Sequence, residues 1–176
     1  MEYLQLSKVY VNNIHNKAGT QAMSIDTAGR VSLPKSPAFY AHTYSGTDGT
    51  RTNGTASTAS LTYSTVTTND GSCWNNTTGE FTCPVAGRYF VSALYGRRLD
   101  STVWFGGTIE HNTNRVIQSW EPPANPADGN MIYLTMSLTC IIDAAVDDTI
   151  APLYYTSYSD PGTSQFENSF TVMYIG

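Results

Sequence analysis

The stretch from Asn69 to Tyr95, NDGSCWNNTTGEFTCPVAGRYFVSALY, decides the fold of this chain. Its first half places Trp74 and Phe81 on either side of a polar segment that contains Gly79. A glycine in such a segment supplies the positive φ that a tight turn needs. The spacing therefore predicts an aromatic residue, a polar turn and a short strand, in that order.

The second half of the stretch predicts a longer strand. Pro84 and Gly87 interrupt the ladder after the first strand, because proline has no amide hydrogen to donate. Successive side chains of a strand point to opposite faces, so alternate residues share a face. The sequence predicts two such sets: the first is Phe81, Cys83 and Val85, and the second is Tyr89, Val91, Ala93 and Tyr95.

Further strands are predicted on both sides of this stretch, separated by turn-rich and proline-rich loops. The clearest of them is Ile132–Ile142, where an apolar residue recurs at every second position: Ile132, Leu134, Met136, Leu138, Cys140 and Ile142. Val103–Gln118 predicts two strands around a turn at His111–Asn114. The other predicted strands are residues 38–44, Leu61–Thr67, Ile150–Tyr155 and Phe166–Tyr174.

The order of these residues resembles the signature of the globular heads of complement C1q, which share a trimeric jelly roll with the tumour necrosis factors. That family's pattern runs from an acidic or amide residue through an aromatic one to Thr-Gly-x-Phe-Thr, and then to Gly-x-Tyr-x-aromatic or aliphatic. The matching places here are Asn69, Trp74, Thr78–Thr82 and Gly87–Val91. The resemblance covers residues 36–176 and implies an all-β, two-sheet antiparallel jelly-roll head that forms a homotrimer.

Apolar residues on both faces of single strands also indicate association. Tyr89 and Phe90 are neighbours that point to opposite faces, and so are Val172 and Met173. One face fills the sandwich, and a threefold interface would cover the other. The residues predicted to lie in the core strands or the trimer interface are Phe39, Tyr89, Phe90, Phe166, Phe170 and Tyr174.

Residues 1–35 are predicted to form a separate N-terminal arm. Met23–Ile25 and Val31–Leu33 alternate around a turn at Thr27–Gly29, which predicts a short hairpin. The string from Ile25 to Val31 resembles the stem and neck segments that precede the heads of bacteriophage fibre proteins. We expect the arm to attach the head to another protein through the apolar residues Leu4, Leu6, Val9 and Val11.

Composition narrows the class of protein. The chain has 176 residues, a net charge of −5 and only 13% charged residues, which argues against binding to a phosphate backbone or an anionic membrane. No apolar stretch approaches the roughly 18 residues that span a bilayer, and the start MEYLQLSKVYVNN lacks the pattern of a secretory signal. We expect no nucleic-acid partner, no membrane insertion, and synthesis in a host cytoplasm.

No pattern predicts catalysis, a cofactor or a metal. The three histidines have no adjacent nucleophile motif and are expected to be structural or solvated: His15, His42 and His111. Asp143, Asp147 and Asp148 cluster at a strand end, where a solvated loop is favoured and a Ca²⁺ site is the alternative. The chain is therefore expected not to be an enzyme.

Cysteines and aromatic residues leave two further alternatives. Cys140 is predicted to be a buried thiol, and a reducing cytosol favours free thiols at Cys73 and Cys83, although these could meet across a turn. Aromatic residues in or beside loops are expected to pack the sandwich or an interface, with glycan binding as the alternative. These residues are Trp120, Tyr154, Tyr155 and Tyr158.

Taken with the resemblance, these features favour a non-enzymatic bacteriophage protein on the virion surface. The first hypothesis is a trimeric capsid decoration or cement protein, because only 35 residues precede the head and a short arm is enough to pin a trimer to a capsid lattice. The alternative is the receptor-binding tip of a tail fibre, whose loops contact a host glycan or protein. A secreted cellular ligand is disfavoured, because the chain has neither a signal peptide nor a Gly-x-y repeat.

Overall fold

The computed structural model describes residues 13–15, 21–32, 36–46, 59–61, 63, 65–99, 105–121, 132–156 and 165–176. Within these ranges the chain forms strands joined by turns, which confirms the predicted all-β class. No helix in them is long and apolar enough to cross a bilayer. The chain divides into two compact units, Met1–Ser36 and Pro37–Gly176, and the second unit is the head.

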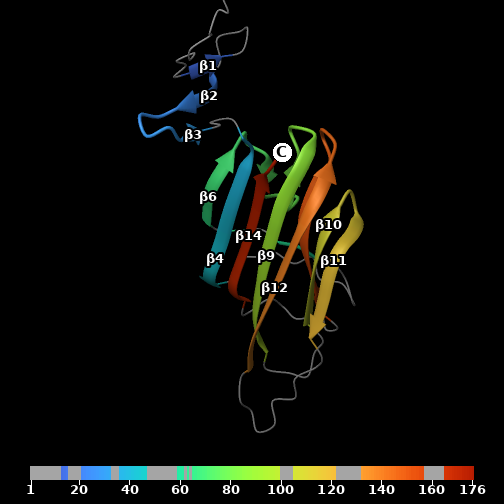
Figure 1. The fold of residues 1–176 in the computed structure, drawn as a ribbon. Helices are drawn as coiled ribbons and strands as arrows, with labels where there is room; N and C mark the ends of the chain where they lie inside the picture. The colour runs from blue at the N-terminus through green and yellow to red at the C-terminus, as the bar shows by residue number, and fades with distance from the viewer. Residues whose placement is uncertain are drawn as a thin grey trace, which may run out of the picture. The chain divides into compact units, whose positions relative to one another are not determined.

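The head is a sandwich of two antiparallel sheets. The first sheet has five strands in the order β12-β9-β14-β4-β6, and four of them lie side by side at the front of Figure 1. The long strand β9 holds this sheet together, since it pairs with β12 in continuous register on one side and with β14 on the other, where the register shifts between Gln165 and Ser169. The bounds are β4 Ala38–Gly46, β6 Thr65–Asp70, β9 Gly87–Leu99, β12 Ile132–Ala144 and β14 Gln165–Tyr174.

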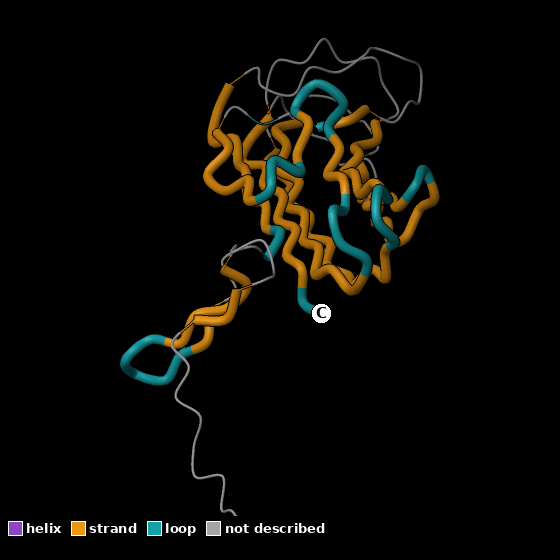
Figure 2. The backbone as a smooth tube through the Cα atoms, turned by 90° about the horizontal axis from the view of Figure 1, so that it is seen from above, coloured by secondary structure: helices purple, strands orange, loops and turns teal. Residues whose placement is uncertain are grey.

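The second sheet has six strands in the order β11-β10-β13-β8-β7, with β5 also paired to β13. Figure 2 shows the strands of the head from above, with the C-terminus leaving after β14. The bounds are β5 Ala59–Ser60, β7 Trp74–Asn75, β8 Glu80–Thr82, β10 Phe105–His111, β11 Asn114–Glu121 and β13 Thr149–Thr156.

Aromatic rings join the two sheets. Phe39 of the five-stranded sheet stacks on Trp74 of the six-stranded sheet, with 4.4 Å between ring centroids. Phe81 meets Tyr89 edge to face at 5.9 Å, again across the two sheets. Such ring pairs stabilise a core beyond their buried area. The predicted inward set of β9 is confirmed, because four residues are fully buried: Tyr89, Val91, Ala93 and Tyr95.

The decisive stretch folds mainly as predicted. Gly79 has a φ of 71°, which confirms the turn between β7 and β8. The prediction that Val85 shares the inward face with Phe81 and Cys83 is wrong, because Val85 is 42% exposed. The ladder of β8 ends at Thr82, and the chain from Pro84 onward turns before β9. The carbonyl of Val85 accepts a 2.6 Å hydrogen bond from the Tyr89 hydroxyl instead.

Two strand boundaries differ from the prediction. The strand expected from Leu61 begins only at Thr65, because the amide of Tyr63 donates to the Asn76 side chain and not to a ladder partner. The strand pair around His111 is confirmed, but its second strand runs on to Glu121. The other predicted strands are present as β4, β12, β13 and β14.

The N-terminal unit contains an antiparallel sheet of three short strands in the order β1-β2-β3: Asn13–His15, Gln21–Ile25 and Val31–Ser32. The predicted hairpin is confirmed as β2 and β3, and β1 adds a strand that was not predicted. Asp26 stabilises the turn, since its carboxylate accepts hydrogen bonds from the amides of Ala28 and Arg30 and from the Arg30 side chain. The predicted attachment residues Leu4, Leu6, Val9 and Val11 lie outside the described residues.

Candidate functional site

The outer face of the five-stranded sheet carries a row of apolar side chains. Phe90 on β9 pairs in register with Ile141 on β12 and with Met173 on β14. Residues directly opposite one another in antiparallel strands point to the same face, and their neighbours Tyr89 and Val172 are fully buried on the other face. The row therefore crosses three adjacent strands on the side that faces away from the core.

This apolar row is not covered by the chain itself. Ile141 is 60% exposed and Met173 is 43% exposed, while Phe90 is half-buried. Single exposed apolar residues are common, but a contiguous row across three adjacent strands marks an interaction surface. We call the surface formed by Phe90, Ile141 and Met173, together with the polar row beside it, the outer face.

The polar row beside it lies one register step along the same strands. Ser92 pairs with Thr139 on one side and Thr171 on the other, and Thr171 pairs with Tyr40. The hydroxyls of Ser92 and Thr139 are 3.2 Å apart, so either donates to the other. Small hydroxyl residues leave this part of the sheet flat, which favours close approach of another flat surface.

The structure separates the predicted core and interface residues into two groups. Phe39, Tyr89 and Phe170 lie in the core, and Tyr174 packs against it. Among the members of this set whose side chains the structure describes, Phe90 is the one on the outer face. Phe166 belongs to β14, but its side chain lies outside the described part of the structure.

Ile141 is the residue of the outer face that the sequence analysis missed. The prediction for this strand considered only the inward set of β12, whose last predicted member is Ile142. The signal was present, because Ile141 is the one apolar residue among the outward neighbours Ser137, Thr139 and Asp143. An apolar residue at an outward position of an otherwise alternating strand predicts contact with a partner.

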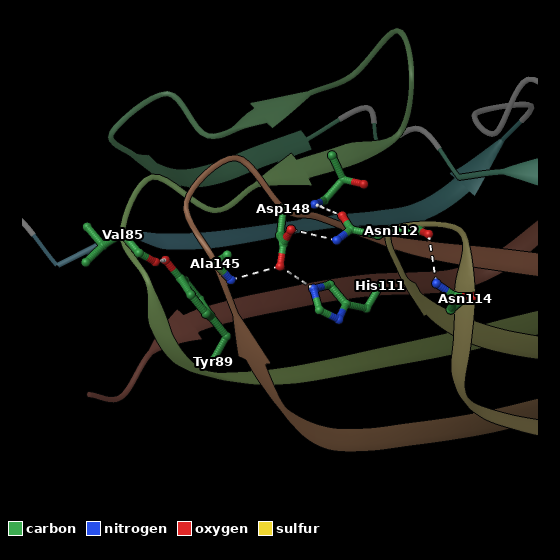
Figure 3. Close-up of polar contacts among 8 residues, drawn as sticks. Val85, Tyr89, His111, Asn112, Asn114, Ala145 and Asp148 are labelled. Atoms are coloured by element: carbon green, nitrogen blue, oxygen red, sulfur yellow. Dashed lines mark hydrogen bonds and ion pairs between the residues drawn. The ribbon is translucent and has the colours of Figure 1, made fainter.

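A polar network closes one end of the six-stranded sheet (Figure 3). The Asp148 carboxylate accepts hydrogen bonds from Asn112 Nδ2 at 2.6 Å and from the Ala145 amide at 2.8 Å, and its Oδ2 lies 2.7 Å from His111 Nε2. The side chain of Asn112 makes a second hydrogen bond, because its oxygen accepts from the Thr149 amide. These bonds tie the β10–β11 turn to the β12–β13 turn.

This network lowers the pKa of Asp148 to about 2, from its ordinary value of 3.8. The Asn112 side chain contributes most, followed by the Ala145 amide and His111. Each donor stabilises the ionised carboxylate more than the neutral acid. His111 thus lies at the end of β10 and has a structural role. The sequence analysis expected it to be either structural or solvated.

The acidic cluster is not organised as a metal site. Among the described residues, no group of three or more His, Cys, Asp or Glu side chains converges to hold an ion. Asp148 uses both oxygens on protein donors, while Asp143 points outward from β12 and Asp147 sits in the turn with a φ of 69°. The three carboxylates therefore do not act together, and the Ca²⁺ alternative is not supported by this geometry.

Aromatic residues proposed for a glycan alternative are placed differently from one another. Tyr154 is only 4% exposed and is part of the core, which confirms the expectation that it packs the sandwich. Trp120 on β11 is 42% exposed, and its indole lies against Gly106 of β10, where an added Cβ would come within 2.7 Å of the ring. Glycine at position 106 is what lets the ring lie close to the strand. Neither the side chain of Tyr155 nor Tyr158 is described.

The cysteines have the character of core thiols. Cys73 and Cys83 are buried, whereas Cys140 is only partly buried on the inward register of β12, so its predicted full burial is wrong. Burial, and then the nearby Asp148 carboxylate, raise the pKa of Cys83 to about 12. Burial also raises the pKa of Cys73 and Cys140. A thiol with a raised pKa holds little thiolate near neutral pH and is a poor nucleophile or metal ligand.

Comparison with known proteins identifies the family. The model of the C1q domain matches residues 38–130, which is more than half of the chain. Among solved structures, the globular domain of the zebrafish complement 1qA protein matches with a TM-score of 0.55 and 13% identity, covering 80% of this chain and 98% of that chain. At that identity the likeness shows the fold alone. No curated protein sequence matches the chain.

C1q domains are generally non-enzymatic heads that form homotrimers. The signature between Asn69 and Tyr95, the two antiparallel sheets and the order of their strands agree with that domain. The chain belongs to the C1q domain family.

Proposed function

We propose that this protein is the homotrimeric, non-enzymatic head of a bacteriophage virion surface protein, and that the outer face forms the threefold contact. The observation that carries the trimer is the row of Phe90, Ile141 and Met173 across three adjacent strands. The same row in three copies would meet around one axis, which is how a closed symmetric assembly covers a repeated surface.

The energetics favour burial of this row. Fully burying a side chain such as Ile, Met or Phe contributes about 1.5–3 kcal/mol, so covering the exposed half of each contributes roughly 1 kcal/mol per residue. The flat polar row beside it adds area without a charged residue that would have to lose its hydration. A stable obligate interface usually buries about 2,000 Å² or more, so the trimer should persist on dilution.

For the role on the particle, we place capsid decoration first. The supporting features are an N-terminal unit separate from the head and its resemblance to bacteriophage stem segments. A trimer presents three such units, so even weak individual contacts with capsid proteins would combine into firm attachment. Under this proposal the protein is made in the host cytoplasm and works on the virion surface.

The second candidate is the receptor-binding tip of a tail fibre. Trp120 favours it, because an exposed indole held close to Gly106 of β10 offers a surface on which a sugar ring of a host glycan can stack. The two candidates differ in abundance: a decoration protein is present in many copies over the capsid, and a fibre tip in few copies at the tail.

The test uses particles that lack the protein. Purified full-length chain should bind to their capsids as a trimer and reach many copies per particle, measured by quantitative electrophoresis and by imaging of labelled protein. Label confined to the tail, at few copies, would replace decoration by the fibre-tip function. A protein that sediments as a monomer of 19.2 kDa at low micromolar concentration would contradict the trimer.

A further inference from the structure

The small N-terminal sheet has one apolar face. Ile14 pairs with Met23, and Ile25 pairs with Val31, in antiparallel register. Met23 and Ile25 are two residues apart on β2, so all four residues share one face of the sheet. The paired residues at the alternate register positions are polar: Asn13, Ser24 and Ser32. We call the first set the arm face.

No member of the arm face is buried within the single chain. Val31 is 59% exposed and Ile14 is 45% exposed, while Met23 and Ile25 are half-buried. A sheet of three strands this short is marginal in water unless its apolar side is covered. The hydrogen bonds of Asp26 stabilise the turn at one end of this sheet, but they cover none of its apolar side chains.

The connection to the head indicates what covers the arm face. Only Leu33–Pro37 separate β3 from β4, and a segment of that length spans at most about 18 Å. In a trimeric head, three N-terminal sheets are therefore held near one another at an effective concentration on the order of millimolar. The apolar surface that each sheet meets most often is then the same face of another copy.

The charges of the unit are compatible with this packing. Asp26 and Arg30 form an ion pair at 2.6 Å within each copy, so the turn carries its own neutralising partner. None of the four residues of the arm face is charged or has a polar side chain. Three copies can thus bring these faces together without burying an unpaired charge.

We propose that β1–β3 of three copies pack their arm faces together around a threefold axis, as a second trimeric unit that strengthens the trimer made by the heads. This inference rests on the proposed head trimer. The partner of the arm face is a second and a third copy of this chain, and a capsid protein would contact other parts of the arm.

Hydrogen exchange of the full-length protein tests this proposal through the backbone amides of β2 and β3. Ile14→Asp places a carboxylate on the arm face, and Asn13→Asp places the same charge at the neighbouring position on the opposite face. We expect exchange about tenfold faster in Ile14→Asp, the ratio that corresponds to loss of one buried aliphatic side chain. Asn13→Asp should exchange like the wild type. Val31→Asp, at the most exposed member of the face, should repeat the effect of Ile14→Asp.

The mass of each variant separates this proposal from the head trimer. Both arm-face variants should remain trimers, because the outer face of the head is intact. Ile141→Asp, which disrupts the head contact, should yield monomers and also abolish the protection of β2 and β3. Wild-type trimers with unprotected arm amides would overturn the arm proposal and leave the head trimer standing. Arm amides protected equally in the Ile141→Asp monomer would show that the chain covers its own face, which also overturns it. A monomeric wild type would contradict both proposals.

Discussion

The two sheets of the head share one core, but they differ in how much of their outward-facing side the chain itself covers. On the six-stranded sheet, Thr108 and Leu153 are paired at outward positions of β10 and β13, and they are 0% and 8% exposed. On the five-stranded sheet, Ile141 and Met173 flank Phe90 at outward positions and remain largely exposed. The single chain thus covers the outward side of β10 and β13 in one sheet and leaves the outward side of β12, β9 and β14 open in the other.

The difference shows that an interaction surface is indicated by exposed apolar residues that continue across several strands, and not by the exposure of single residues alone. The six-stranded sheet also exposes apolar residues, Val116 at 44% and Trp120 at 42%, but both lie on β11 at the edge of that sheet. Edge residues can remain in solvent singly. The row of Phe90, Ile141 and Met173 instead runs from the edge strand β12 across β9 to β14, so it forms one continuous apolar surface that a partner can cover.

The largest expected effect concerns the core that both sheets share. Phe39→Ala removes a ring that contacts Trp74, Phe81 and Phe170, and should lower the free energy of unfolding by about 3–5 kcal/mol. Denaturant unfolding followed by tryptophan fluorescence measures it. A loss below about 1 kcal/mol would mean that the two sheets are not joined through this ring cluster.

A smaller effect concerns the polar network at the end of the six-stranded sheet. The folded-state pKa of Asp148 is about 2 and its ordinary value is 3.8, so the ionised carboxylate stabilises the fold fully above 3.8 and loses this effect as the pH falls through about 2. The Asp148→Asn variant has no carboxylate at this position and so cannot carry the negative charge. The melting temperature of the wild type should exceed that of the variant near neutral pH.

The pH profile distinguishes this charge effect from a simple loss of packing. The gap in melting temperature between wild type and Asp148→Asn should narrow as the pH is lowered from 3.8 toward 2. Asp143→Asn, at an outward position of β12, serves as the control and should leave the profile unchanged. A gap that stays constant over this range would show that the charge of Asp148 does not stabilise the fold.

The smallest expected effect concerns the three cysteines. All three are free thiols in the structure, and their raised pKa values keep them protonated. Adding reductant should therefore leave the melting temperature unchanged. An intact disulfide typically contributes about 2–4 kcal/mol, so a clear drop under reductant would reveal a bond between Cys73 and Cys83.

Local patterns made most of the fold predictable. The alternation of Ile132–Ile142 and the spacing around Gly79 depend on neighbours in sequence, and both gave the correct strands and turn. Val85 followed the same alternation but lies beyond the end of the β8 ladder, and only the tertiary hydrogen bonding shows where a ladder ends. Strand type was therefore more predictable than strand end.

The candidate site was less predictable, because it depends on pairing between distant segments. Phe90 was selected from its own strand, but its neighbours in the apolar row come from β12 and β14. The contacts of Asp148 with His111 and Asn112 join residues 37 and 36 positions apart in the chain. No short-range pattern signals such a contact. The predicted attachment by Leu4, Leu6, Val9 and Val11 stays a prediction.

Two matched substitutions test most directly whether the open outer face on β12, β9 and β14 is the proposed trimer interface. Met173 and Val116 are 43% and 44% exposed, and they lie on the two different sheets. Sedimentation equilibrium of Met173→Asp and Val116→Asp at low micromolar concentration gives their masses. The account predicts a monomer of 19.2 kDa for Met173→Asp and a trimer, as in the wild type, for Val116→Asp. A trimer for Met173→Asp, or a monomer for Val116→Asp alone, would contradict it.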